Sequence, residues 1–300
     1  MAKAKVWVQF PKTGLGNMLL VWANAFVFAQ VNNLELHTSR WWAFHWGAFW
    51  RGESKKRFYA GYFFQDGFLK MLKHWFNRQN KVVVRNPPLQ QVALTGKDTN
   101  TLYLFDKLVT HEQMFLNLAP YRETLSAALH AMLRDDKKKA LRDLPVPEIA
   151  VHIRRGDFNT TGQATSLDFF IGGIRAVREA IGRNIPVTVF SDANEKELKP
   201  LFDLPAIMMA TPKADILDIL LMSRSKILLL SQSSSFSYWA AFLSEALVIM
   251  KHDDWQEGLK PNGGRYQEIK WDMEKDDLTS IVKKIFQQNL SIASSFAEQD

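Results

Sequence analysis

The sequence predicts an α/β protein built on parallel sheets, and three features of the chain lead to that fold class. Apolar runs of four to six residues alternate with segments of helical periodicity through the second half of the chain. A glycine-rich turn, Pro11–Asn17, joins the apolar run Lys5–Phe10 to the helical stretch Met18–Val31. Strand, turn and helix in this order open an α/β unit. Runs that are apolar throughout are typical of strands covered on both faces, as in a parallel sheet.

The first half of the chain ends at a proline-rich break. Lys81–Arg85 is predicted to be a strand, which Asn86-Pro87-Pro88 stops. Tyr121–Leu141 has helical spacing and carries three lysines near its end, where cations stabilise a helix. Pro145-Val146-Pro147 then interrupts the chain. We therefore predict an N-terminal α/β domain at residues 1–146.

The second half alternates strands and helices regularly, which predicts a second domain at residues 147–275. The predicted strands are Glu148–Ile153, Val187–Phe190, Lys226–Leu230 and Ala246–Met250. The predicted helices are Leu167–Ile181, Asn194–Phe202, Asp215–Ser223 and Phe236–Ser244. An amphipathic helix begins at Leu278, so residues 276–300 are predicted to form a C-terminal helix and a tail that frays from Ser291.

Composition excludes several classes of site. The chain has no cysteine, which rules out disulfide scaffolds, thiolate zinc sites and cysteine nucleophiles. It has no Asp-x-Asp triplet and no histidine cluster with ligand spacing, so no metal site and no divalent requirement are predicted. The formal net charge of +7 favours anionic partners. No known nucleic-acid motif accompanies that charge, so nucleic acid is not an expected partner.

The sequence predicts a cytoplasmic chain without a membrane span. The longest apolar stretch, Met18–Val31, is interrupted by Asn24 and Gln30 and is shorter than the about 20 residues that cross a bilayer. Met1–Phe10 carries two lysines but no long apolar core and no cleavage site follow, so no signal peptide is expected.

Polar clusters follow three of the predicted strands. Ligands of parallel sheets bind at these carboxyl ends of the strands. The clusters are His152–Asp157, Ser191-Asp192 and Ser231–Ser237. An arginine there can bind a phosphate through charge-assisted bonds, and serines at a helix N-terminus can hold an anion. A carboxylate can accept two hydrogen bonds from a guanine edge. Together the three clusters predict a site for a nucleoside diphosphate.

Each cluster alone also has a structural interpretation. Arg-Arg-Gly-Asp is a common surface turn with a local ion pair. Serines before a helix are usually N-caps, and an aspartate at a strand end is often a turn former. The functional interpretation depends on three strands directing polar groups to one edge of one sheet.

These motifs, in order, resemble those of the inverting α-1,2-fucosyltransferases, which are related to the α-1,6- and protein O-fucosyltransferases. His152–Asp157 resembles the family's His-x-Arg-Arg-Gly-Asp signature, and Gly14–Asn17 resembles its N-terminal Gly-Leu-Gly-Asn turn. Gly61–Gln65 resembles a Gly-Tyr-aromatic-Gln segment. The similarity extends over residues 5–255 and includes Phe190–Asp192, Asp218–Ser223, Ser231–Ala241 and Val248-Ile249 with Trp255.

The resemblance implies a GT-B fold, in which two Rossmann-like domains face a central cleft. It implies an inverting, metal-independent galactoside fucosyltransferase that uses GDP-fucose as donor and needs no cofactor. The implied catalytic residues are Arg154 at the β-phosphate, Asn17 at the reacting centre and Asp157, which pairs with Arg155 behind Arg154. The implied donor-binding residues are His152, Arg154, Arg155, Ser191, Asp192, Ser234, Ser235, Phe236, Gly14 and Gly16, with His152 and Asp192 at the guanine nucleoside.

The chain departs from the family pattern at several positions. Met18 replaces a usual Gln, Ala193 a usual Asp, and Tyr238 a usual Trp. Ser231 replaces the usual Asn at the start of its motif, and Lys251 a common Pro. These departures leave two alternatives open: another GDP-hexose donor, and a non-catalytic nucleotide- or sugar-binding module.

The acceptor side is less determined by the sequence. Asp66 and Glu53 are candidate general bases, although each is more often a surface carboxylate. The aromatic segment Trp41–Trp50 has three interpretations: core packing, a platform for an acceptor sugar, and a rim that touches a membrane surface. The third would suit a lipid-linked glycan acceptor at the inner face of the membrane.

Overall fold

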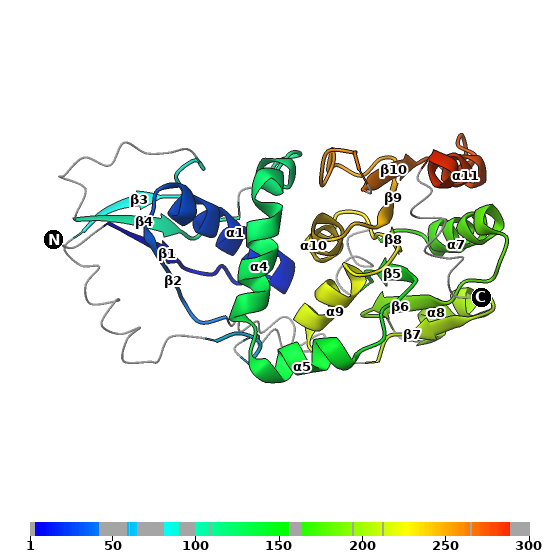
Figure 1. The fold of residues 1–300 in the computed structure, drawn as a ribbon, viewed down its shortest axis with the longest axis horizontal. Coiled ribbons are helices and arrows are strands. Elements are labelled where there is room, and N and C mark those ends of the chain that lie inside the picture. Colours follow the sequence, from blue (N-terminus) through cyan, green and yellow to red (C-terminus); the bar gives the residue numbers. More distant parts are fainter. Residues whose placement is uncertain are drawn as a thin grey trace. The chain divides into compact units, whose positions relative to one another are not determined.

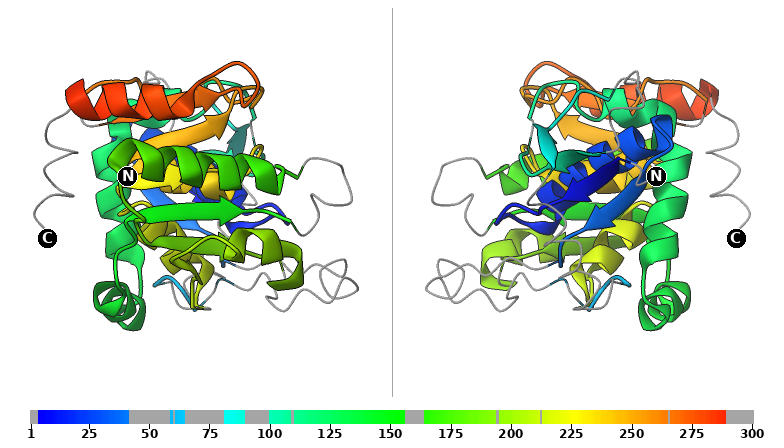
Figure 2. Two further views of the ribbon diagram at one scale, coloured as in Figure 1. Left: turned by 90° about the vertical axis from the view of Figure 1, so that its right-hand side faces the viewer. Right: turned by 90° about the vertical axis from the view of Figure 1, so that its left-hand side faces the viewer.

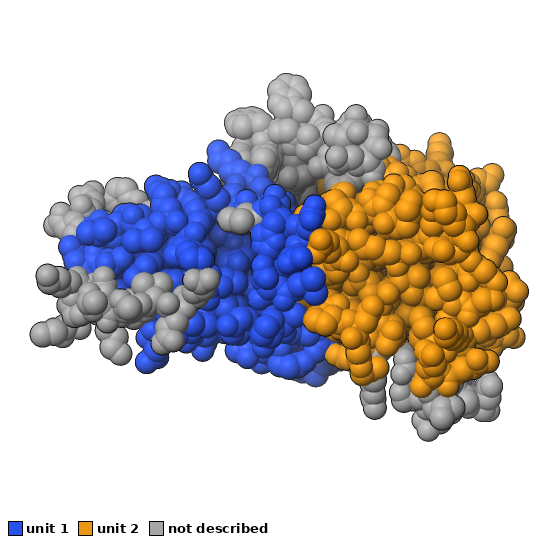
Figure 3. All heavy atoms as spheres, turned by 90° about the horizontal axis from the view of Figure 1, so that it is seen from above, with its two compact units in different colours: residues 1–142 blue, residues 143–300 orange. Residues whose placement is uncertain are grey.

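The computed structural model of the 300-residue chain describes two compact units, residues 1–142 and 143–300, which Figure 3 colours separately. The described residues are 4–41, 59, 61–64, 81–89, 100–108, 110–155, 164–193, 195–211, 213–264 and 266–288.

The first unit contains a four-stranded parallel sheet. Its strands are β1 (Lys5–Val8), β2 (Glu35–Thr38), β3 (Val82–Arg85) and β4 (Thr101–Phe105), in the order β2-β1-β4-β3. Helix α1 (Leu15–Val31) follows β1 and leads back to β2. The sheet and α1 share a core in which Phe28 packs against Tyr103 and Phe105. Most of α1 is buried, which explains why its apolar residues surround the helix instead of forming one stripe.

The remaining helices of this unit are η2 (Leu116–Tyr121), α4 (Arg122–Met132) and α5 (Asp135–Asp143). The sequence predicted one continuous helix over Tyr121–Leu141, and the structure corrects this. The backbone N–H of Phe64 donates to Met132 O at 2.8 Å, and that of Arg134 donates to Tyr62 O at 3.0 Å. Leu133 is extended and fully buried between them, so the pairing with Tyr62–Phe64 divides the helix.

The second unit contains a six-stranded parallel sheet. Its strands are β5 (Ile149–Ile153), β6 (Val187–Ser191), β7 (Ile207–Met209), β8 (Ile227–Leu229), β9 (Leu247–Lys251) and β10 (Gln267–Trp271). Their order is β10-β9-β8-β5-β6-β7. Strands β6 and β7 therefore lie to one side of β5, and β8, β9 and β10 lie to the other. This is the doubly wound order of a Rossmann fold.

Helices cover both faces of this sheet. Figure 1 shows α7 (Leu167–Ile181), α8 (Glu195–Phe202) and α11 (Leu278–Gln288) on one side of the strands, with α9 (Asp215–Met222) and α10 (Ser235–Leu243) on the other. In the left view of Figure 2, α7 lies across the front of the strands. Coverage of both faces is why every residue of the two central strands, β5 and β8, is buried.

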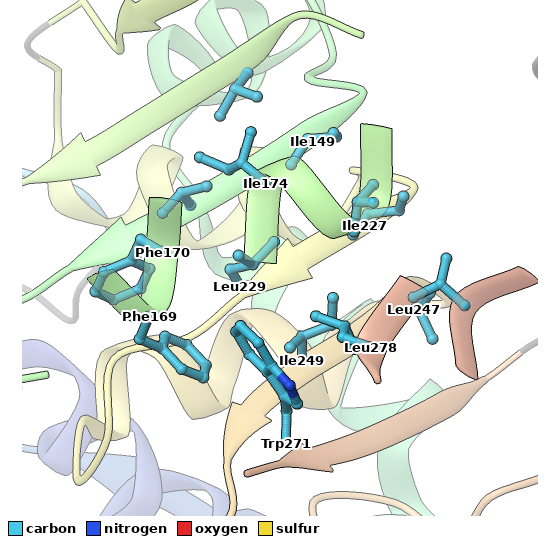
Figure 4. Close-up of a cluster of buried hydrophobic side chains, with 14 of the residues drawn as sticks. Ile149, Phe169, Phe170, Ile174, Ile227, Leu229, Leu247, Ile249, Trp271 and Leu278 are labelled. Atoms are coloured by element: carbon cyan, nitrogen blue, oxygen red, sulfur yellow. The ribbon is translucent and has the colours of Figure 1, made fainter. Parts of the chain in front are cut away.

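The core under α7 and α11 is centred on Trp271. Figure 4 shows Trp271 beside Phe169 and Ile249, and the rings of Trp271 and Phe169 are 5.3 Å apart. A Cβ built on Gly173 of α7 would come within 2.7 Å of the Leu229 side chain, so this glycine permits the close approach of helix and sheet. Helix α11, predicted as part of a separate C-terminal piece, contributes Val282 to the same core.

The predicted α/β class with parallel sheets is confirmed. The predicted helix Leu167–Ile181 has the same bounds in the structure, and the other strands and helices predicted between residues 147 and 275 differ by at most one residue at either end. Four strands were not predicted: β2, β4, β7 and β10. The frayed tail from Ser291 lies outside the described residues.

Candidate active site

The doubly wound order creates a switch point between β5 and β8. These neighbouring strands pair through Ile149 with Ile227 and Val151 with Leu229, but the chain leaves them toward opposite sides of the sheet. In such sheets ligands bind outside the carboxyl ends of the strands at the switch point. The three polar clusters identified in the sequence lie at or directly after the carboxyl ends of β5, β6 and β8.

The end of β5 is linked to the end of β6 through Asp192. The Asp192 carboxylate forms an ion pair with the Arg154 guanidinium through Oδ2. Its Oδ1 accepts a hydrogen bond of 2.7 Å from the backbone N–H of Arg155. The Ser191 hydroxyl donates to Ile153 O at 2.6 Å and accepts from the backbone N–H of Ala193 at 3.0 Å. Arg154 is therefore oriented by Asp192 at the carboxyl edge of the sheet, with 27% of its side chain exposed.

The end of β5 is linked to the end of β8 through Ser231. The buried Ser231 hydroxyl donates to His152 O at 2.9 Å and accepts from the backbone N–H of Arg154 at 2.8 Å. The next residue, Gln232, donates its backbone N–H to Thr165 Oγ1 at 2.9 Å. Ser231 thus satisfies two backbone groups that the sheet leaves unpaired where β8 ends.

Helix α10 begins directly after this turn. Ser234 is its N-cap, and the Ser234 hydroxyl accepts a hydrogen bond from the backbone N–H of Ser237 at 3.5 Å. The N-terminus of a helix carries a partial positive charge that favours anions. Arg154 and the α10 N-terminus therefore bring two sources of positive potential to one edge of the sheet.

His152 joins β5 to α10. The imidazole is buried, its Nδ1 shares a hydrogen bond of 2.5 Å with the Ser237 hydroxyl, and its ring stacks on Phe236 at 5.1 Å. Burial, and secondarily the nearby Arg154 cation, lowers the pKa of His152 to about 3. The ring is therefore neutral at physiological pH.

A comparison with protein families decides the class of the chain. The family model described as glycosyl transferase family 11 matches residues 91–253, which is more than half of the chain. The chain belongs to glycosyl transferase family 11. The matched range contains all three polar clusters of this family 11 glycosyltransferase.

The fold also resembles those of solved glycosyltransferases at low sequence identity. A fucosyltransferase NodZ from Bradyrhizobium has a TM-score of 0.47 and 14% identity, with 81% of this chain and 94% of that chain covered. A FUT1 mutant of Arabidopsis thaliana in complex with GDP has a TM-score of 0.48 and 12% identity, with 83% and 71% covered. The heptosyltransferase WaaC of E. coli with ADP has a TM-score of 0.45 and 14% identity, with 96% and 99% covered. No curated protein matches the chain significantly.

The predicted site residues of the first unit lie at the start of α1. Gly14 is the helix N-cap, and Gly16 and Asn17 belong to its first turn. Asn17 is half-buried, and Gly16 is buried. The sequence predicted these three residues in a turn before a helix that starts at Met18, whereas the helix starts at Leu15 and takes in Gly16 and Asn17.

Several predicted residues of the family 11 enzyme lie outside the described part of the chain. They are Asp157, the candidate bases Asp66 and Glu53, Gln65 and most of the aromatic segment, Trp42–Trp50. Trp41 is described and belongs to the core: it is buried between Phe10 at 4.1 Å and Phe63 at 4.4 Å. The core interpretation therefore holds for Trp41.

Sequence reasoning missed three residues that hold the site together. They are Thr165, which binds Gln232, and the buried pair formed by Tyr238 and Asp254. Tyr238 could have been noticed as a departure from the family pattern, but nothing in the sequence pairs it with Asp254.

No set of three or more His, Asp or Glu side chains that could hold a metal ion occurs in the described part of the chain. Within that same part, no helix combines the length and apolar character needed to cross a bilayer.

Proposed function

We propose that this family 11 glycosyltransferase moves L-fucose from GDP-fucose to a hydroxyl of a glycan, with inversion and without a bound metal. The 2-hydroxyl of a galactose is the proposed acceptor. The observation that carries the proposal is the meeting of Arg154, Asp192 and the α10 N-terminus at the switch point of a doubly wound sheet. The choice of GDP-fucose rests on the motif that begins at His152.

Arg154 and α10 supply the chemistry that the leaving group needs. In a single displacement at the anomeric carbon, the bond to the diphosphate breaks and GDP gains negative charge. The Arg154 guanidinium and the backbone of Ser235 and Phe236 at the start of α10 would stabilise that charge, as fixed donors stabilise developing oxyanions. Two such groups can replace a divalent cation, so we propose that activity survives chelation.

The nucleoside end of the donor is assigned to His152 and Asp192. Asp192 has Arg154 and the Arg155 backbone as partners, so guanine recognition would share its carboxylate with Arg154. A neutral, buried His152 would contribute shape and a hydrogen bond, not charge. Ser191 would hold Asp192 in register, since its hydroxyl bonds to both neighbouring backbone segments.

The first unit is proposed to bring the acceptor. The resemblance assigns Gly14 and Gly16 to the donor and Asn17 to the reacting centre. Asp66 and Glu53 remain the candidate bases that would deprotonate the acceptor hydroxyl.

The acceptor would be a free oligosaccharide or a lipid-linked glycan, in a cytoplasmic enzyme with peripheral membrane contact. The net charge of +7 favours the contact with an anionic surface. Flotation with anionic liposomes at low and high salt tests it, and binding that is absent at low salt would remove the membrane from the proposal.

The reaction itself is tested by GDP release. The purified chain is incubated with GDP-fucose in EDTA, with and without lactose or N-acetyllactosamine. Acceptor-stimulated release supports the donor, the metal independence and the galactoside acceptor together. GDP binding without release from GDP-fucose would direct attention to other GDP-hexoses, and the absence of both would refute the donor site.

A further inference from the structure

The turn that joins β8 to α10 contains a residue in an unfavourable backbone conformation. Ser233 has a φ of +56°, in the left-handed region that non-glycine residues rarely adopt. Its neighbours in the chain are Gln232 and Ser234, the N-cap of α10. A conformation of this kind persists when its surroundings hold it in place, so the contacts of the neighbouring residues decide the shape of the turn.

Thr165 holds Gln232 through the backbone. The backbone N–H of Gln232 donates to Thr165 Oγ1 at 2.9 Å, and Thr165 is only 3% exposed. The next residue, Ser166, is the N-cap of α7, and its hydroxyl accepts a hydrogen bond of 3.3 Å from the backbone N–H of Phe169. Phe169 is fully buried in the core under α7. Thr165 is therefore attached to a well-packed part of the unit.

The segment after β9 holds Gln232 through its side chain. Gln232 Nε2 donates to Asp253 O at 3.1 Å and to Asp253 Oδ1 at 3.3 Å. The Asp253 carboxylate pairs through Oδ2 with the ammonium of Lys251, the last residue of β9, at 2.8 Å. The backbone N–H of Asp254 also donates to Lys251 O at 3.1 Å. Gln232 is therefore bound to two different connections of the sheet.

These contacts fix the turn with neutral groups, because neither a hydroxyl nor a primary amide carries a charge. Ser231 is bound to the end of β5, and Ser234 caps α10. Gln232 lies between these two serines, so its contacts fix the start of α10 relative to the end of β5. Arg154 directly follows that strand end. The hold on Gln232 therefore sets where the α10 N-terminus lies relative to Arg154.

We propose that Thr165 and Gln232 are positioning residues for donor binding: they hold the turn so that the α10 N-terminus faces the diphosphate together with Arg154. The inference rests on the proposed function, because the shape of the turn matters for activity only if the diphosphate binds there. It assigns the role to one hydroxyl acceptor and one amide donor. Both act through the backbone of the turn, so their loss should affect the phosphates and not the guanosine part of the donor.

The first test compares Thr165→Val with Thr165→Ser. Calorimetric titration gives the affinity for GDP, and the same titration in the presence of guanosine gives the affinity for a probe without phosphates. Thr165→Val should weaken GDP about tenfold, as the loss of one buried hydrogen bond does, and should raise the KM for GDP-fucose with it. The affinity for guanosine and the KM for the acceptor should stay unchanged. Thr165→Ser keeps the hydroxyl and should restore the wild-type affinity for GDP.

Gln232→Met tests the second contact, because methionine has a similar length but cannot donate a hydrogen bond. It should weaken GDP about threefold, less than Thr165→Val, because the bond between Gln232 and Asp253 is exposed to water. Gln287→Met makes the same change at an exposed position of α11 and should bind GDP as the wild type does.

The outcomes separate this inference from the proposed function. Wild-type chain that binds no GDP refutes both. Wild-type chain that binds GDP, with Thr165→Val or Gln232→Met binding it equally well, overturns the positioning role of that residue alone. Equal losses of GDP and guanosine affinity, or a lower thermal midpoint with unchanged GDP affinity, also overturn the role, since a purely structural contact gives these results. If Thr165→Val does not fold, the comparison of Gln232→Met with Gln287→Met decides the question.

Discussion

The Nδ1 atom of His152 lies 2.5 Å from the Ser237 hydroxyl oxygen, and this contact joins the carboxyl end of strand β5 to helix α10. Both side chains are buried, with exposed fractions of 6% and 0%. The imidazole also stacks on Phe236, which lies in the first turn of the helix. The carboxyl edge of the sheet is thus built around a neutral histidine, and protonation of this histidine should lower the stability of the fold.

Acid should destabilise the chain through His152. The pKa of its imidazole falls from the ordinary 6.5 to about 3 in the folded chain, mainly because of burial. Between pH 6.5 and 3 the unfolded chain therefore binds the additional proton. The stabilisation is fully present above pH 6.5 and is lost as pH falls, by up to about 1.4 kcal/mol per pH unit. Urea unfolding at pH 7.5, 6.0 and 5.0 measures it.

His152→Gln is the matched control, because glutamine can still bond to Ser237 but does not titrate. Burial raises the pKa of the Asp254 and Glu268 carboxyls, which gives a pH dependence of opposite sign. The wild type and His152→Gln both contain these carboxyls, so their contribution cancels when the unfolding free energies of the two chains are subtracted at each pH. Equal pH slopes for the two chains would show that His152 is not held neutral.

Removing the Asp192 charge should weaken donor binding. Asp192→Asn keeps an acceptor for the Arg155 backbone but loses the ion pair with Arg154. We expect the KM for GDP-fucose to rise about tenfold, as when one hydrogen bond to a charged group is lost. Steady-state kinetics measures it, with the exposed Asp168→Asn as control. An unchanged KM would mean that Asp192 neither orients Arg154 nor contacts the donor.

The core of the second unit should depend strongly on Trp271. It packs on Phe169 and against the glycines of α7, where a Cβ on Gly172 would come within 3.0 Å of its ring. Trp271→Ala should lower the free energy of unfolding by about 3 kcal/mol or more. Met208→Ala, at a side chain 53% exposed, should change it by less than about 0.5 kcal/mol. Denaturant unfolding compares them, and similar losses would contradict the assigned core.

The sequence was most informative where one principle governs the local structure. The α7 helix has both a serine N-cap at Ser166 and a left-handed Gly182 at its end, so its bounds are visible in the sequence. Strand β7 has only three residues, none of them fully buried, and gives no such pattern. The division of α4 from α5 depends on Phe63 pairing with Leu133, a contact between distant residues that no local pattern records.

The same distinction applies to the site. Arg154, Asp192 and Ser231 could be selected because each directly follows an apolar strand, and parallel strands bring their carboxyl ends together. The pairing of Tyr238 with Asp254 joins a helix to a loop across 16 residues, and that of His152 with Ser237 joins a strand to a helix across 85. Such contacts depend on which elements the topology makes neighbours.

The binding of GDP to Arg154→Ala tests the central claim most directly. Calorimetric titration would compare the wild type, Arg154→Ala and Arg175→Ala, which removes an exposed arginine of α7. If the switch point holds the diphosphate, Arg154→Ala should weaken GDP by about a hundredfold, the effect of two charge-assisted hydrogen bonds, and Arg175→Ala should leave it unchanged. Equal GDP affinity in all three chains would contradict the placement of the donor at the ends of β5 and β8.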